Sequence, residues 1–447
     1  MIKSSTIIIV FFLCLNNFSF SQSKFIVQNK KQIDRINFKL LNNLMVIPVE
    51  INGIKLSFIL DTGVSKPIIF NFLNVSDTLK IKNTETIFLR GLGEGESVKA
   101  FKSTNNIFKV GDAIKLDQEL YAVYDANLNF APRLGVPVHG IIGYDLFKDL
   151  VVEINYSKKL IKLSNPNKYK YKNCKKCETL NLEFYNNKPY IHAGVKINGE
   201  RISIKLLIDS GGSDSLWLFE DDSLGIKSGK KFFNDFLGHG LSGSVFGKRS
   251  RIDAFYLKSF ELNDANVAYP DSSSISFARN FKDRNGSLAG NILKRFNLIF
   301  NYQKAQLTIK KNLHFKEKFS YNHCGIEIAH EGVRLVKEVD NRILKNEKSG
   351  LQNNQTINSN RIIIDTQYQL LLKPAYAIVE LRNGSPADKA GLKIGDIIIS
   401  INNKASYNYS LQELTKKFYD DVGKQIKLRV DRFGQDLTFT FNLEEPF

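Results

Sequence analysis

Two acidic tripeptides stand out for the chemistry that they can perform together. The tripeptides at 61–63 (Asp-Thr-Gly) and 209–211 (Asp-Ser-Gly) each follow an apolar run, 58–60 in the first case and 206–208 in the second. Two carboxyl groups held close together share one proton, because like charges at short range do not ionise independently. One member of such a pair can take a proton from water while the other donates a proton. The two tripeptides therefore predict one acid–base site built from two similar segments.

The surroundings of the two tripeptides repeat along the chain. An Asn-Gly pair between alternating apolar segments precedes each acid, at 52–53 and at 198–199, and predicts a hairpin whose second strand ends at the acid. Two apolar residues and a glycine follow each acid, at 141–143 and 288–290, with the glycines 82 and 81 residues beyond the acids. A repeat of this length that occurs twice indicates a duplicated lobe rather than a solenoid.

Each repeat also contains a glycine-rich stretch between the acid and the later apolar segment. The first stretch includes Gly91 and Gly93, and the second includes Gly238 and Gly240. Glycine adopts backbone angles that other residues avoid, and it lets the main chain approach a ligand closely. The matched placement favours two hairpin flaps that close over a cleft and contact substrate, with ordinary surface loops as the alternative.

This pattern resembles the retropepsin-like aspartic proteases over residues 40–312, here with both lobes in one chain. The resemblance implies a mainly β protein with two closed β-barrel lobes related by a pseudo-twofold axis. It also implies that Asp61 and Asp209 face each other across that axis as a catalytic dyad, with no metal and no organic cofactor.

The resemblance assigns supporting roles to the residues that follow each acid. It implies that the hydroxyl groups of Thr62 and Ser210 brace the two active-site loops against each other. It implies that Gly63 and Gly211 allow a tight turn and close backbone packing. Val64 departs from the pattern, because the family more often has a small residue at that position.

The last third of the chain carries a different set of motifs. A turn, a short helix that ends at Gly391, a second turn at Gly395 and then an apolar strand resemble the PDZ domains of bacterial exported proteases. The apolar positions Leu411, Leu414 and Phe418 share one face of a helix. PDZ domains bind an extended peptide as an added strand, usually with a chain-end carboxylate held by backbone amides. A C-terminal peptide is therefore a candidate ligand, and a structural PDZ domain that binds none is the alternative.

The best candidate for the peptide-binding loop of this domain is the segment of Gly325, Ile326 and Ile328. The polar stretch at 331–366 is expected to be an insertion or a loop. The expected domains are listed in chain order: a signal peptide at 1–21, lobe 1 at 37–165, a linker at 166–179, lobe 2 at 180–312 and the PDZ domain at 322–445.

The N-terminal segment 1–21 has a positive charge, a short apolar centre and a small-x-small end, which predicts a secretory signal. The mature protein is therefore expected to be exported, periplasmic or secreted, without a transmembrane anchor. Cys174, Cys177 and Cys324 remain after cleavage. A disulfide in an exported protein either joins the first two or joins one of them to Cys324, with free or metal-bound thiols as the alternative.

The formal net charge of +18 comes from basic residues scattered along the whole chain. No nucleic-acid-binding module is recognisable, so a basic solvated surface is expected and no nucleic-acid partner. The sequence as a whole predicts an exported aspartic endopeptidase of bacterial type that acts on protein or peptide substrates. The rival from another class is a non-catalytic, exported scaffold that binds peptides through degenerate protease lobes and the PDZ domain.

Overall fold

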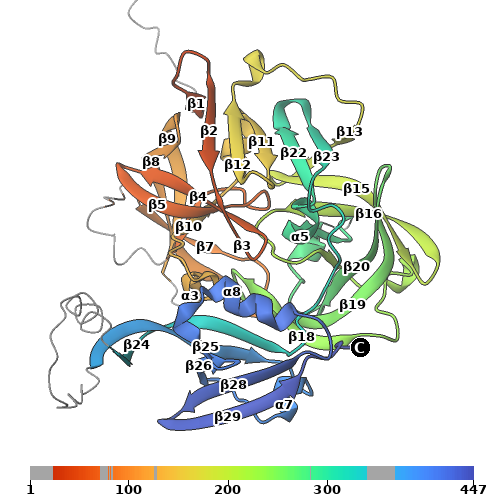
Figure 1. Cartoon of the computed structure of the whole chain (residues 1–447). Helices are drawn as coiled ribbons and strands as arrows, with labels where there is room; N and C mark the ends of the chain where they lie inside the picture. The colour runs from red at the N-terminus through yellow and green to blue at the C-terminus, as the bar shows by residue number, and fades with distance from the viewer. Residues whose placement is uncertain are drawn as a thin grey trace, which may run out of the picture.

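The computed structural model describes residues 24–70, 79, 81, 84–124, 128–281, 283–339 and 368–447. The expected signal segment 1–21 lies outside these residues, and so does most of the expected polar insertion at 331–366. The described part of that insertion, 331–339, belongs to a strand rather than to a loop. The described residues form a mainly β protein with four sheets and a few short helices, as the sequence predicts (Figure 1).

The first half of the chain forms a nine-stranded sheet. Its path is β1-β9-β6-β10-β5-β4-β8-β7; β3 pairs with β4, and β8 pairs with β9 as well as with β4. The strands are β1 (Ile26–Val27), β3 (Lys39–Leu41), β4 (Leu44–Ile51), β5 (Ile54–Leu60), β6 (Ile68–Phe70), β7 (Thr84–Leu89), β8 (Val98–Val110), β9 (Ala113–Val123) and β10 (Gly140–Ile142).

The second half forms an eight-stranded sheet with corresponding pairings. Its path is β14-β15-β16-β21-β17-β20-β19-β18, and β15 also pairs with β19. The strands are β14 (Glu183–Tyr185), β15 (Lys188–Ile197), β16 (Glu200–Asp209), β17 (Leu216–Leu218), β18 (Phe233–Gly240), β19 (Gly243–Leu257), β20 (Phe260–Pro270) and β21 (Gly286–Ala289). Closure of each sheet into a barrel and a twofold relation between the lobes stay predictions.

A third sheet of six strands is shared by the two halves. Its path is β13-β23-β22-β11-β12-β2, and the antiparallel β11–β22 pair at its centre joins one half to the other (Figure 1). The strands are β2 (Ile33–Asn37), β11 (Val151–Asn155), β12 (Leu160–Ser164), β13 (Cys177–Asn181), β22 (Phe296–Asn301) and β23 (Gln306–Lys311). Strand β13 begins inside the segment that was expected to be a linker, and β2 begins before the expected start of lobe 1.

The C-terminal unit has a sheet of its own, with the path β24-β25-β26-β28-β29 and β27 beside β26. The strands are β24 (Ile326–Val339), β25 (Tyr368–Leu381), β26 (Ile397–Ile401), β27 (Lys404–Ala405), β28 (Gln425–Arg432) and β29 (Gln435–Asn442). Helix α8 (Leu411–Lys416) begins at a capping box of Ser410 and Glu413 and buries Leu411 and Leu414, which confirms the predicted helix.

The remaining described helices are short. They are α3 (Ala131–Leu134), α4 (Tyr144–Asp149), α5 (Gly290–Leu293) and α7 (Pro386–Lys389), with the 3₁₀ turns Pro166–Lys168, Asp222–Leu224, Ala278–Asn280, Tyr302–Lys304, Ser406–Asn408 and Lys417–Tyr419. No described helix is long and apolar enough to cross a bilayer.

The two Asn-Gly pairs form the turns that the sequence predicts. Asn52 and Gly53 have φ of 50° and 87°, and Asn198 and Gly199 have φ of 52° and 86°. Two consecutive residues in the left-handed region define the type I′ turn, whose twist matches that of the flanking strands. The hairpins β4–β5 and β15–β16 therefore deliver the two acids in the same way.

Strand register corrects one correspondence within the repeat. Ile142 on β10 lies beside the residue that precedes the first acid, and Leu288 on β21 lies beside the residue that precedes the second acid. Gly143 therefore corresponds to Ala289, and not to Gly290 as the spacing of the glycines suggests. A Cβ atom on Gly143 would lie 1.8 Å from the carbonyl oxygen of the first acid, so only this half requires glycine there.

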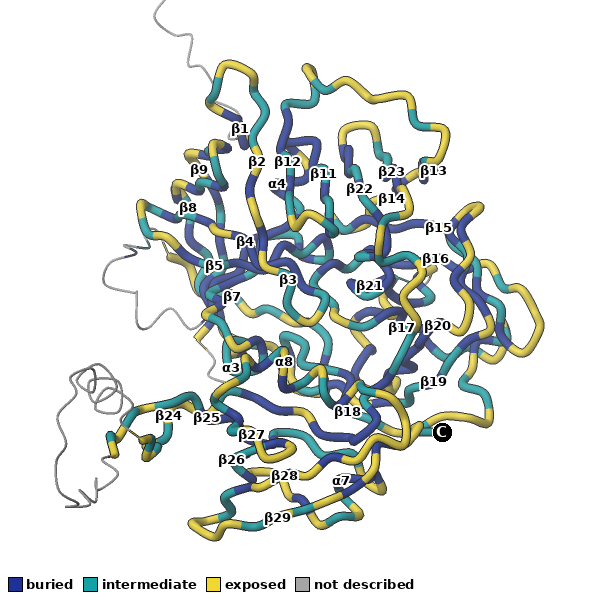
Figure 2. The backbone as a smooth tube through the Cα atoms, in the orientation of Figure 1, coloured by how far each residue is buried: buried dark blue, intermediate teal, exposed yellow. Residues whose placement is uncertain are grey.

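Buried backbone concentrates where the two large sheets meet the shared sheet, and the hairpin ends are exposed (Figure 2). Helix α4 of the first half packs into this region against β22 of the second half. The Phe147 ring lies 5.1 Å from that of Phe300 in an edge-on contact and 5.3 Å from that of Tyr302 in a stacked one. Aromatic contacts of this kind add to the free energy gained by burial.

The cysteines separate into one disulfide and one thiol. Cys174 and Cys177 are joined by a disulfide, which resolves the alternatives that the sequence left open. Cys324 is a buried free thiol in the core of the C-terminal unit. Burial raises its pKa to about 12, so the thiol is neutral and packs as a small apolar side chain.

We expect the contact between α4 and β22 to contribute strongly to stability. Phe147→Ala should lower the free energy of unfolding by about 3–5 kcal/mol, because the ring is 0% exposed and its removal leaves a cavity. Phe88→Ala is the matched control, because Phe88 is 70% exposed, and its effect should stay within about 0.5 kcal/mol. Urea denaturation of the two variants measures the difference, and equal midpoints would contradict the packing described here.

Candidate active site

The two acids lie at corresponding ends of central strands. Asp61 follows β5 directly, and Asp209 is the last residue of β16. Each strand has a parallel neighbour, β10 for the first and β21 for the second, so the backbone of both acids is held from the side. The Asp61 amide donates to the carbonyl of Ile142 at 2.8 Å.

The loops after the two acids are joined by a reciprocal set of hydrogen bonds. Thr62 Oγ1 donates to the carbonyl of Ile208 (2.7 Å) and accepts from the amide of Ser210 (3.0 Å). Ser210 Oγ donates to the carbonyl of Leu60 (2.8 Å) and accepts from the amide of Thr62 (3.0 Å). The hydroxyl groups of Thr62 and Ser210 thus satisfy four buried backbone groups across the junction of the two halves.

The turns after the acids bring the two carboxyl groups together. The Gly63 amide donates to Asp61 Oδ1 at 2.6 Å, and the Gly211 amide donates to Asp209 Oδ1 at 3.1 Å. A Cβ atom on Gly63 would lie 3.1 Å from Asp61 Oδ1 and 3.4 Å from Asp209 Oδ1. One on Gly211 would lie 2.3 Å from Asp61 Cγ. Both carboxyl groups therefore occupy the space that these two glycines leave open.

This environment favours the protonated form of the pair. The pKa of Asp61 is raised to about 7, first by burial and second by the charge of Asp209, although the Gly63 amide and Lys188 oppose the shift. Burial also raises the pKa of Asp209, against the charges of Arg284 and Lys188. Because the two groups interact strongly, they titrate as a unit with one proton between them.

Two hairpins cover the acids, one from each half, and their tips are joined. The tip of β7–β8 meets the tip of β18–β19, where the Ser242 amide donates to the carbonyl of Leu92 (2.9 Å). The amides of Gly95 and Gly91 donate back to the carbonyl (2.7 Å) and to the Oγ (3.1 Å) of Ser242. The glycine-rich stretches are therefore the places where two backbones touch.

The four glycines predicted for these hairpins do not share one role. Gly91, Gly238 and Gly240 line the cleft. Gly93 does not line the cleft, but it packs against the neighbouring hairpin as Gly91 and Gly240 also do: a Cβ atom on Gly93 would lie 2.5 Å from the carbonyl carbon of Ser242, and one on Gly240 would lie 2.1 Å from the carbonyl oxygen of Leu92. The tips therefore need glycine for their mutual contact as well as for an approach to substrate.

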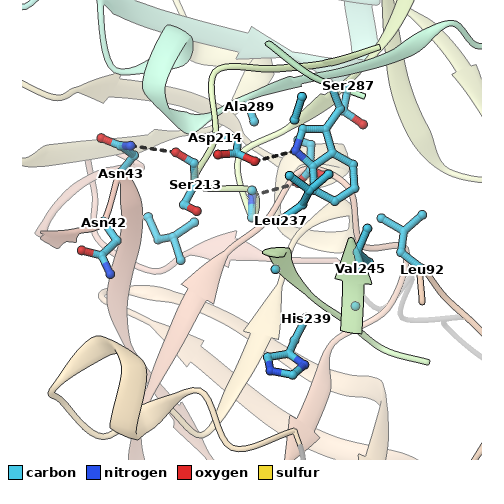
Figure 3. Close-up of a pocket in the computed structure, with 18 of the residues that line it drawn as sticks. Asn42, Asn43, Leu92, Ser213, Asp214, Leu237, His239, Val245, Ser287 and Ala289 are labelled. Atoms are coloured by element: carbon cyan, nitrogen blue, oxygen red, sulfur yellow. Dashed lines mark hydrogen bonds between the residues drawn. The ribbon is translucent and has the colours of Figure 1, made fainter. Parts of the chain in front are cut away.

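A large cleft of about 1510 Å³ runs beneath the hairpins and contains both acids. Figure 3 shows part of its wall, where Asn43 Nδ2 donates to the carbonyl of Ser213 at 2.7 Å. Asp214 accepts from the indole of Trp217 (2.7 Å) and from Arg249 (2.7 Å), so the charge of Arg249 balances that of this carboxylate. His239 projects from the β18 hairpin toward the same space (Figure 3).

Short Asn-Asn hairpins from each half reach across to the active-site loop of the other half. The β3–β4 turn carries Asn43, whose side chain bonds to Ser213 after the second acid. The β14–β15 turn carries Asn186, whose carbonyl accepts from Ser65 Oγ after the first acid at 2.8 Å. The Asn-Asn pairs at 42–43 and 186–187 repeat in the sequence, and all four residues have positive φ, so this repeat could have predicted the contact.

The C-terminal unit docks on lobe 1 beside the cleft, where α8 lies next to α3 (Figure 1). Arg133 on α3 bonds to Glu327 (3.1 Å) and to Glu380 (2.7 Å). The side chain of Gln412 on α8 donates to the carbonyl of Leu134 at 2.7 Å. The edge of β24 therefore faces the first lobe, where a strand-like ligand of a PDZ domain would otherwise lie.

The segment predicted to hold a peptide carboxylate is already engaged. The amides of Cys324 and Gly325 both donate to Asn322 Oδ1, at 3.1 and 2.9 Å. Ile326 and Ile328 are buried in the core of the C-terminal unit. The contacts here fit the docked, structural role better than the peptide-binding one.

Two further residues of the cleft were missed from the sequence. Lys188 begins β15, Arg284 precedes β21, and both line the cleft with the two acids. Neither belongs to a recognisable motif, so only the folded structure reveals their place. Over the described residues, no group of three His, Cys, Asp or Glu side chains is arranged to hold a metal ion.

The reciprocal hydrogen bonds of Thr62 and Ser210 lead to a prediction about stability. Thr62→Val keeps the shape but removes the hydroxyl, so the Ser210 amide and the Ile208 carbonyl both lose a buried partner. The free energy of unfolding should fall by about 2–4 kcal/mol. Thr86→Val, at an exposed position of β7, is the control and should change it by less than about 0.5 kcal/mol. A urea midpoint for Thr62→Val equal to that of the control would show that the hydrogen bonds of the Thr62 hydroxyl do not stabilise the fold.

Comparisons with known proteins agree with this geometry. Residues 47–146 match the family model described as aspartyl protease, and residues 378–432 match the one described as PDZ domain. A search of the curated proteins finds no match to the chain. The chain therefore contains an aspartyl protease domain in its first half and a PDZ domain near its C-terminus.

Proposed function

We propose that this protein is an aspartic endopeptidase in which Asp61 and Asp209 form the catalytic dyad. The observation that carries the proposal is that both carboxyl groups approach the same point, within 3.4 Å of where a Cβ atom on Gly63 would lie, in a cleft that two hairpins cover. The aspartyl protease match covers only the first half, and the repeated loops and pairings supply the argument for the second.

The dyad acts with one proton shared between its members. The ionised carboxylate accepts a proton from a water molecule, whose oxygen attacks the carbonyl carbon of the peptide bond. The protonated carboxyl group donates its proton to the carbonyl oxygen, which gives a tetrahedral diol. The diol then returns a hydroxyl proton to the dyad, the C–N bond breaks, and the amine nitrogen takes the other proton. The dyad ends with the single proton with which it began.

The cleft fits an extended polypeptide, since its volume is about 1510 Å³ and residues from both halves line it. The joined hairpin tips have to separate when a chain enters, and on closing they exclude water from the dyad. The PDZ domain extends one wall of the cleft, so its proposed role is to position or regulate substrate rather than to bind a separate chain end.

We also propose that the protein is exported. The pattern of residues 1–21 is that of a secretory signal. The disulfide between Cys174 and Cys177 suits an oxidising compartment. Protein or peptide substrates would then be met outside the cytosol.

The proposal is tested by replacing each acid with its neutral isostere. Asp61→Asn and Asp209→Asn should each lower kcat/KM on a mixed peptide library by at least roughly 10³-fold, because neither variant can both accept and donate the proton. Asp283→Asn is the control, since Asp283 lies outside the cleft with its side chain 69% exposed, and it should retain the wild-type rate.

Mass spectrometry of the digests, with and without a statine-type transition-state mimic, measures the effect. Cleavage at the wild-type rate by either dyad variant would overturn the assignment. Saturable peptide binding without products, by the wild-type protein, would favour the non-catalytic scaffold instead.

The raised pKa of the dyad predicts a pH profile that extends to neutral pH. The active form holds one proton, and the pKa of Asp61 is raised to about 7, mainly by burial. As pH rises through this value the shared proton is lost, so kcat/KM should fall about tenfold per pH unit above roughly pH 7. Initial rates between pH 4 and pH 9 measure the profile, and loss of activity already near pH 5 would contradict the raised pKa.

A further inference from the structure

The two halves of the cleft floor differ at corresponding positions. The registers of β4–β5 and β15–β16 equate Leu44 with Lys188. The registers of β5–β10 and β16–β21 equate Val138, two residues before β10, with Arg284, two residues before β21. Two apolar residues on one side of the dyad are thus replaced by two cations on the other.

The first of these two sites is apolar. Leu44 and Val138 are buried in one hydrophobic cluster together with Ile59, Val64 and Phe70. All of these except Val138 also line the cleft. A substrate side chain on this side of the dyad meets hydrocarbon, so an apolar residue gains most from binding there.

The second site is built around a buried guanidinium. Arg284 is 8% exposed, its Nε donates to the carbonyl of Gly286 (3.1 Å), and its NH2 group donates to Ser287 Oγ (2.7 Å). The hydroxyl group of Tyr190 also acts on this side chain and raises the pKa of the guanidinium, against the effect of burial. These contacts fix the direction of the guanidinium, as a preorganised recognition group requires.

The polar neighbours of Arg284 also differ between the two halves, because the corresponding positions in the first half hold apolar residues. By register, Tyr190 corresponds to Val46, and Ser287 corresponds to Ile141. Both partners are therefore absent from the apolar half. The second half thus differs from the first at Arg284 and at the residues around it, which indicates a binding site rather than an isolated charge.

Lys188 lies beside this guanidinium on the same side of the cleft. It starts β15, directly after the Asn-Asn turn that reaches the first active-site loop. The ring of Tyr185, its partner across the hairpin, stacks on Phe281 at 4.3 Å and forms a wall of the same subsite. Burial lowers the pKa of Lys188, and the charge of Arg284 lowers it further.

The charges in this subsite do not balance. The charges of Asp61 and Asp209 act on Lys188, and the charge of Asp209 acts on Arg284. A dyad that keeps one proton carries a single negative charge, against two cations. A partly buried site with an excess positive charge is stabilised by an anion that enters it.

We propose that Lys188 and Arg284 form a specificity subsite for an acidic side chain next to the scissile bond. With the apolar subsite around Leu44 on the opposite side of the dyad, the enzyme cleaves between an apolar residue and a glutamate or aspartate. The carboxylate of the substrate forms ion pairs with the two cations and balances the remaining positive charge. This inference rests on the proposed peptidase function, whose dyad the subsite adjoins.

Two pairs of matched octapeptides test the subsite. One pair contains Phe-Glu or Phe-Gln at its centre, and the other contains Glu-Phe or Gln-Phe, so that both directions of the chain are sampled. For one of the two directions kcat/KM should be at least about tenfold higher with Glu than with Gln, because a charge-assisted pair is lost with the amide. Equal or lower values for Glu in both directions would overturn the proposal.

A variant of Lys188 connects the preference to this residue. Lys188→Met should reduce the Glu-to-Gln ratio of kcat/KM at least about fivefold. Lys196→Met, on the same strand but outside the cleft, is the control and should leave the ratio unchanged. If Lys188 only tuned the dyad, both peptides would change by the same factor and the ratio would stay constant, which would also overturn the proposal.

The outcomes separate this inference from the proposed function. Cleavage of all four peptides without a preference for Glu would overturn the proposed subsite but would still support the proposed peptidase function. If the wild-type protein cleaves none of them, calorimetry with analogues that carry a reduced central bond decides. At least tenfold tighter binding of the Glu analogue would then support the subsite although catalysis fails, and equal binding would overturn both.

Discussion

Two buried carboxyl groups held close together are unfavourable, because each raises the cost of ionising the other and both lose hydration. The fold has to hold them together, and the reciprocal hydrogen bonds of Thr62 and Ser210 do so directly. These bonds join the backbones of the two active-site loops, so neither acid can withdraw without leaving buried amide or carbonyl groups unpaired. The β11–β22 pairing at the centre of the shared sheet keeps the two halves in the orientation that these hydrogen bonds need.

The two halves agree at positions that fix the path of the backbone and differ at positions on the floor of the cleft. Both halves keep the Asn-Gly turns, the Asn-Asn turns and the hydroxyl after the acid, because these fix the chain path. Side chains on the cleft floor have diverged, with Leu44 on one side and Lys188 on the other. A scaffold that is repeated for geometry can therefore carry two chemically different subsites, which a symmetric dimer of one lobe cannot do.

Much of this arrangement could be predicted from local patterns. The acids, the hairpins that deliver them and the helix of Leu411 and Leu414 depend on turn chemistry and periodicity within a few residues. The shared six-stranded sheet could not be predicted, because it pairs strands far apart in the sequence. The correspondence of Gly143 was misjudged because glycine spacing does not report register. Lys188 and Arg284 could not be predicted as site residues, because neither belongs to a sequence motif and only the folded structure places them beside the two acids.

Arg133 shows how the PDZ domain is connected to the cleft that contains the two acids. Its guanidinium bonds to Glu327 and Glu380 of that domain and lies 4.9 Å from the ring centre of Phe236, on the β18–β19 hairpin that covers the dyad. Its NH2 group also lies 3.4 Å from Nε2 of His239, and burial together with this cation lowers the pKa of that imidazole. Opening of the hairpin must break these contacts or carry Arg133 with it. The position of the PDZ domain thereby enters the free energy of opening, although the domain touches neither acid.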